Sequence, residues 1–91
     1  MIKTFKHKGL KRLFRNDDTS GVQSHLVEKL QRILTRLEYA EELEDMNLLG
    51  YRLHQLHGDL KGVYTVTVNA NWRVTFRFSN GNATDVDLID Y

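Results

Sequence analysis

Four side chains in the second half of the 91-residue sequence are suited to phosphodiester chemistry: His54, His57, Arg73 and Tyr91. Cleavage of RNA through its 2′-hydroxyl needs a base, a cation beside the pentavalent phosphorane and an acid for the leaving 5′-oxygen. Imidazole titrates near neutral pH, and guanidinium binds phosphate through paired hydrogen bonds. A tyrosine is a poor acid unless its pKa is shifted. These four residues are therefore the candidate catalytic groups, with Tyr91 the least suited to proton transfer.

The alternation of apolar and polar residues predicts that Arg73 and Tyr91 share a surface. From 72 to 78 the apolar side chains occupy every second position and must face the helices, which turns Arg73 to the opposite face. From 84 to 88 the inward positions are the even ones, so Tyr91 has the outward parity. Whether the two side chains meet depends on strand register, which the sequence leaves open.

His54 and His57 flank Gln55-Leu56 just before Gly58, and a turn beginning near His57 could bring both imidazoles to one rim. With Asp59 they also form the pattern H-x-x-H-x-D, which could hold a divalent metal, but no third strong ligand is evident. Each candidate has an ordinary alternative too: a surface histidine, an arginine paired across strands, or a tyrosine that anchors the chain end.

Two helices are expected before the sheet that carries these residues. The spacing of leucine and isoleucine from 22 to 39 predicts an amphipathic helix with a broad apolar stripe. A shorter helix is predicted over 8–15, where Gly9 is an unfavourable residue. Residues 2–5 are consistent with a short strand, and 40–46 with a short acidic helical turn.

After Gly50 the period changes from 3.6 to 2, which indicates strands. Strands are predicted near 64–68, 72–78 and 84–88, joined by asparagine-rich turns at 69–71 and 80–82, with an earlier strand beginning at 51–53. The expected fold is one domain, 1–91, of the α+β class: two N-terminal helices packed on an antiparallel sheet of three to five strands.

Composition narrows the possible functions. The chain has no cysteine, which excludes disulfides, thiolate nucleophiles and cysteine-ligated zinc. It has no apolar run near 18 residues and no apolar stretch typical of a signal peptide, so we expect a cytoplasmic protein that does not enter membranes.

Charge is segregated along the chain. Residues 1–15 carry six Lys and Arg and no acid, whereas 16–49 carry eight acids and three bases. The basic segment suits a polyanion, although short amphipathic helices also carry solvated charges.

The chain resembles HigB toxins of the RelE-like superfamily of bacterial toxin–antitoxin systems, also called plasmid maintenance system killer proteins. The segments 1–11, 51–59 and 71–78 carry the resemblance, together with the ending Asp90-Tyr91. The Leu-His-x-Leu and Asn-Trp-Arg-Val-x-Phe motifs are fairly specific in combination. The resemblance spans essentially the whole chain and implies a microbial-RNase-like fold.

The resemblance implies a toxin that cleaves messenger RNA in the A site of the 70S ribosome without a metal or other cofactor. It implies that His54 acts in acid–base catalysis or positions the RNA. It also implies that Arg73 stabilises the phosphate transition state and that Tyr91 positions the substrate. It also implies a HigA-type helix-turn-helix antitoxin through which alone the toxin meets operator DNA. The basic residues expected to meet ribosomal RNA are Lys3, Lys6, Lys8, Lys11 and Arg12.

Two departures from the family pattern bear on activity. Relatives commonly have lysine where this chain has His57, and they usually end in Asp-Tyr-His, whereas this sequence stops at Tyr91. The expectation is therefore an endoribonuclease whose activity is weakened by the missing histidine. The alternative is a non-catalytic RelE-like module that binds the antitoxin or the ribosome. The acidic residues expected to lie away from RNA and to meet the antitoxin are Glu38, Glu41, Glu42, Glu44 and Asp45.

Overall fold

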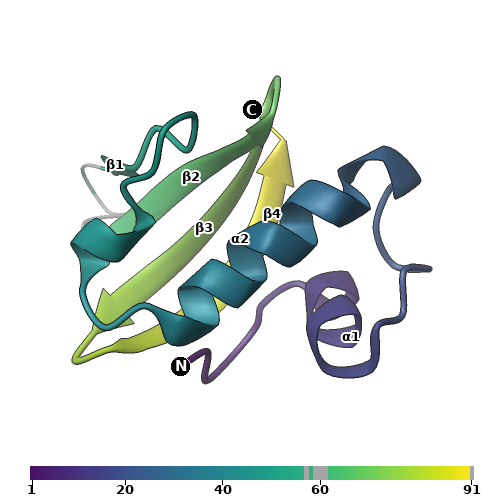
Figure 1. The fold of residues 1–91 in the computed structure, drawn as a ribbon, viewed down its shortest axis with the longest axis horizontal. Coiled ribbons are helices and arrows are strands. Elements are labelled where there is room, and N and C mark those ends of the chain that lie inside the picture. Colours follow the sequence, from purple (N-terminus) through teal and green to yellow (C-terminus); the bar gives the residue numbers. More distant parts are fainter. Residues whose placement is uncertain (57, 59–61, 91) are drawn as a thin grey trace.

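A layer of helices covers one face of a four-stranded antiparallel sheet in the computed structural model, which describes residues 1–56, 58 and 62–90 (Figure 1). The helical elements in chain order are α1 (Lys8–Asn16), the 3-10 turn η1 (Ser24–Leu26), α2 (Val27–Tyr39) and the 3-10 turn η2 (Leu43–Met46). The strands are β1 (His54–Gln55), β2 (Val63–Asn69), β3 (Trp72–Ser79) and β4 (Asn82–Asp90). Their order in the sheet is the order of the chain. The expected α+β arrangement is therefore observed.

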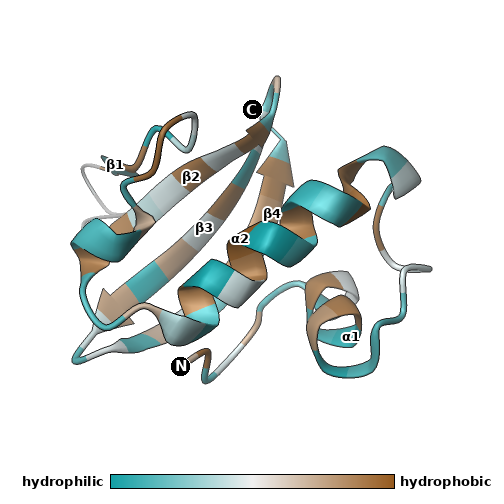
Figure 2. Ribbon diagram, viewed as in Figure 1, coloured by the Kyte–Doolittle hydropathy of each residue, from teal (hydrophilic) through white to brown (hydrophobic). Residues whose placement is uncertain are grey.

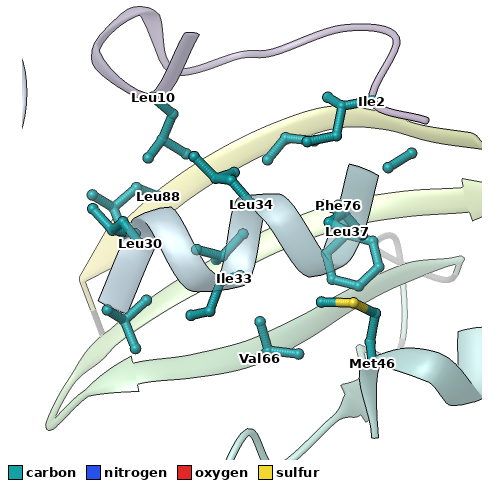
Figure 3. Packing of buried hydrophobic residues seen from close by; sticks show 14 of the residues in the cluster. Ile2, Leu10, Leu30, Ile33, Leu34, Leu37, Met46, Val66, Phe76 and Leu88 are labelled. Atoms are coloured by element: carbon teal, nitrogen blue, oxygen red, sulfur yellow. The ribbon is translucent and has the colours of Figure 1, made fainter. Parts of the chain in front are cut away.

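The core lies between α2 and the inner face of the sheet. Leucine and isoleucine side chains of α2 are buried there, whereas the opposite side of the helix is hydrophilic (Figure 2). Phe76 at the centre of β3 is fully buried, as are Val66 and Val74 on the same face. Figure 3 shows Phe76 and Val66 close to the α2 side chains and Met46. The alternation predicted for β3 is confirmed, because its aromatic and aliphatic side chains face the helix.

The first residues of the chain pair with the edge of the sheet. Ile2 and Phe5 form isolated parallel bridges with β4, and the Lys3 amide donates to the Ala83 carbonyl at 2.8 Å. The short strand expected over 2–5 is thus extended chain that covers the edge of β4.

The start of α2 and the start of β1 differ from prediction. The helix expected from about 22 begins as the 3-10 turn η1, and in the described part of the chain no side chain caps either η1 or α2. The strand expected from 51–53 is confined to His54–Gln55. Arg52, at φ 52°, interrupts the extended backbone between the Tyr51 carbonyl, which accepts from the Thr67 amide of β2 at 2.7 Å, and the ladder with β2, which begins at His54.

A bulge in β4 changes the predicted parity of its first half. Arg77 pairs with Thr84 and Thr75 with Asp87, so two residues of β4 stand opposite Phe76 alone. Asp85, at φ 54°, takes up the extra residue. Ala83 is consequently buried in place of Thr84, while Val86 and Leu88 point inward as predicted.

Candidate active site

His54 and Arg73 lie on the outer face of the sheet, opposite α2. His54 pairs with Thr65 on β2, and Arg73 pairs with Thr67, two residues further along the same strand. Because residues two apart in a strand share a face, the two candidate catalytic side chains flank one stretch of β2. They line a common hollow of about 400 Å³. The full lining is Arg52, Leu53, His54, Leu56, Thr65, Thr67 and Arg73.

The turn between β2 and β3 holds the Arg73 side chain. Its Nη1 donates to the Ala70 carbonyl at 2.7 Å and to the Trp72 carbonyl at 3.2 Å. Ala70 has a φ of 47°, and this left-handed backbone accompanies the reversal between the two strands. The positive charge is therefore held beside the hollow by backbone groups of its own hairpin.

His54 is positioned by the register of a two-residue strand. Its side chain is exposed, and the strand ends where the Leu56 amide donates to the Val63 carbonyl at 2.9 Å. The direct partner of His54 is Thr65, and opposite side chains in antiparallel strands lie about 5 Å apart at Cβ. An exposed imidazole at the rim of a hollow is accessible for proton transfer with a bound ligand.

Two of the predicted catalytic residues, His57 and Tyr91, lie outside the described residues. Asp59 lies outside them as well. Of the three residues in the H-x-x-H-x-D pattern, only His54 is therefore among the described residues. Within residues 1–56, 58 and 62–90, no group of three or more metal-ligating side chains is close enough to hold an ion.

The predicted basic residues occupy different surroundings. Lys6 lines a second hollow on the outer face of the sheet, of about 210 Å³, together with Arg77 and Asp87. Leu56 lines both hollows, so Lys6 lies on the face that carries His54 and Arg73. Arg12 forms an ion pair with Asp18 at 3.5 Å. The other three, Lys3, Lys8 and Lys11, are exposed on the N-terminal segment and α1.

Sequence reasoning missed Arg52 and Thr65 as residues of the hollow. The signal for Thr65 is the outward parity that it shares with Thr67 between the apolar residues of β2. That parity becomes informative only once β1 is paired with β2, because the pairing places His54 opposite Thr65.

A family model described as the RelE-like toxin of the type II toxin–antitoxin system HigB matches residues 3–91. The chain belongs to the HigB-like toxin family. The protein named Endoribonuclease HigB from Proteus vulgaris is 46% identical over 91 residues, which span all of this chain and 99% of that relative. The resemblance noted from the sequence motifs is thereby confirmed, and a toxin of a type II system has an antitoxin as its partner.

Crystal structures of YafQ from E. coli share the fold of this HigB-like toxin. One, from strain BL21(DE3), matches with a TM-score of 0.64 at 16% identity and covers 99% of this chain and 91% of the YafQ chain. A mutant form of YafQ matches with a TM-score of 0.62 at 17% identity, and the match again covers 99% of this chain and 91% of the YafQ chain.

In the described part of the chain, no helix is long and apolar enough to cross a membrane.

Proposed function

We propose that this HigB-like toxin is a metal-independent endoribonuclease that cuts messenger RNA in the A site of the 70S ribosome. The observation that carries the proposal is the shared hollow, which is lined by both His54 of β1 and Arg73 of β3. Membership of the HigB-like family and a 46% identical relative named an endoribonuclease support it.

The proposed reaction uses the RNA's own 2′-hydroxyl as nucleophile. The 2′-oxygen bonds to the adjacent phosphorus, the bond from phosphorus to the 5′-oxygen breaks, and a 2′,3′-cyclic phosphate remains. One proton leaves the 2′-hydroxyl and another joins the 5′-oxygen, and His54 performs one of these transfers. Arg73 stabilises the negative charge that accumulates on the phosphorane. His57 takes the other transfer and Tyr91 positions the RNA in this scheme.

We further propose that the basic N-terminal residues bind ribosomal RNA through phosphates. The residues are Lys3, Lys6, Lys8, Lys11 and Arg12. Lys6 supports this best, since it lies on the face of the sheet that carries the hollow. Phosphate contacts are insensitive to sequence and weaken with added salt. We also propose that the toxin acts in the cytoplasm, where ribosomes are.

The proposed partner is a helix-turn-helix antitoxin of the HigA type, through which alone the toxin meets operator DNA. The proposed contact surface is acidic and consists of Glu38, Glu41, Glu42, Glu44 and Asp45. Two hollows adjoin this surface, and both are lined by Tyr39, which is 79% exposed. An exposed aromatic ring among carboxylates suits a basic, partly apolar segment of a partner.

Growth of bacteria that express the toxin tests the catalytic proposal. We expect the wild-type chain to arrest growth and Arg73→Ala to relieve the arrest. Arg32→Ala is the matched control, because Arg32 is an exposed arginine on α2 that pairs with Glu28 and lies away from the hollow. Arrest that survives Arg73→Ala would favour the alternative, a module that blocks the ribosome by binding alone.

A further inference from the structure

The hydroxyl of Thr65 is buried without a hydrogen-bond partner. Thr65 is 4% exposed, and among the described residues its Oγ1 is the buried side-chain polar atom that has no partner. Burial of an unpaired hydroxyl destabilises a fold, and valine has nearly the same shape without that penalty. A threonine here therefore calls for a reason other than stability.

Thr65 lines the hollow that contains the candidate catalytic groups. It pairs directly with His54 on β1 and with Thr75 on β3, and Arg73 is its diagonal neighbour two residues before Thr75. Diagonal neighbours across a sheet are within reach of a long side chain. A phosphate that touches both the imidazole and the guanidinium therefore lies over the stretch of β2 from Thr65 to Thr67, where the unpaired hydroxyl belongs to Thr65.

We propose that Thr65 is a substrate-contacting residue whose hydroxyl donates a hydrogen bond to a non-bridging oxygen of the scissile phosphate. The inference rests on the proposed endoribonuclease function and adds a third group to its site. The hydroxyl keeps its proton throughout, so it stabilises the growing negative charge and takes no part in acid–base transfer. Because Oγ1 is covered in the free protein, a side chain that lines the hollow must move when the RNA enters.

Thr75 is a matched control for Thr65. It is also a threonine on the outer face, it is 8% exposed, and it is the direct cross-strand partner of Thr65. It lines the neighbouring hollow and not the one with His54 and Arg73. Substitution of either threonine by valine removes one hydroxyl from the same face of the sheet with little change of volume.

The experiment compares Thr65→Val, Thr65→Ser and Thr75→Val for messenger RNA cleavage on programmed 70S ribosomes and for thermal unfolding. We expect Thr65→Val to cleave about tenfold to a hundredfold more slowly while its Tm is unchanged or raised. Thr65→Ser and Thr75→Val should cleave at rates within about threefold of the wild-type rate. Loss of a charge-assisted hydrogen bond would lower the cleavage rate by more than this.

Four results would overturn the inference. Wild-type cleavage by Thr65→Val would show that the hydroxyl does not contact the reacting phosphate. Slow cleavage by Thr65→Val together with a lowered Tm, or by Thr75→Val to the same degree, would assign the threonine a structural role. A wild-type chain that binds ribosomes and cuts nothing would refute the endoribonuclease function, and this inference with it.

Discussion

Substitution of Gly9 by alanine should destabilise this toxin, although the same change in most helices is favourable. Gly9 lies in the first turn of α1, where alanine would improve helix propensity by about 1 kcal/mol. The structure opposes that gain. A Cβ added at Gly9 would lie 2.2 Å from the carbonyl oxygen of Gly21 and 2.8 Å from its carbonyl carbon.

The size of the clash sets the expected magnitude. Real Cβ atoms essentially never approach another heavy atom within 3.0 Å, so the backbones of α1 and the loop at Gly21 must separate by about 0.8 Å. The two backbones are close from both sides, because a Cβ on Gly21 would in turn lie 2.6 Å from Gly9 Cα. Overpacking of this kind costs about 1–3 kcal/mol, and the clash here is with backbone, so we place the cost at the upper end. The net loss of unfolding free energy should be about 2 kcal/mol.

Urea unfolding of Gly9→Ala and of Lys8→Ala measures this loss. Lys8 is the matched control, because it is an exposed residue of the same turn whose replacement by alanine leaves the contact with Gly21 intact. We expect the midpoint to fall for Gly9→Ala and to change little for Lys8→Ala. A higher midpoint for Gly9→Ala would refute the close packing between α1 and Gly21.

Further predictions concern acid stability, partner binding and RNA binding. Hydrogen bonds from the Glu42 and Glu41 amides lower the pKa of Asp45, so its contribution to stability is present above the unfolded pKa and is lost as pH falls through the lower folded pKa. The difference in unfolding free energy between wild type and Asp45→Asn should therefore become smaller as the pH falls below about 4. Urea titrations at several pH values would measure this difference, and a difference that stays constant would contradict the prediction. Glu41→Lys combined with Glu42→Lys should weaken antitoxin binding in calorimetry, and an unchanged affinity would remove this surface from the interface. Lys6→Gln should make ribosome binding less sensitive to salt in filter-binding assays, with the salt slope falling by about one unit.

The fold was predictable where local patterns agree with the final packing. In β3 every second residue is apolar and packs in or against the core, and the Asn80-Gly81 turn has the two positive φ values that its sequence favours. At Asp85 prediction failed, because an aspartate continues the alternation and carries no sign that it forms a bulge. β1 failed for a related reason. Two residues are too few for a periodic signal. Arg52 adopts a positive φ, which the sequence does not indicate because the residue is neither glycine nor asparagine.

The candidate site was predictable in its chemistry and not in its assembly. Parity places Arg73 on the outer face, and this is confirmed. The proximity of His54 and Arg73 depends on pairings that join residues distant in the sequence, and only the folded sheet shows them. Thr65 illustrates the limit most clearly. Its outward parity is readable from the sequence, but the buried and unpaired state of its hydroxyl follows from packing across three strands.

Cleavage of messenger RNA on programmed 70S ribosomes tests the central claim most directly. Wild type, Arg73→Ala and the control Arg32→Ala would be compared by mapping the 3′ ends of the message. The account predicts cuts within the A-site codon for wild type and Arg32→Ala, and a loss of about a hundredfold or more for Arg73→Ala, the usual effect of removing one donor to a transition-state charge. Ribosome binding by the wild-type toxin without any cut, or cutting by Arg73→Ala at the wild-type rate, would contradict it.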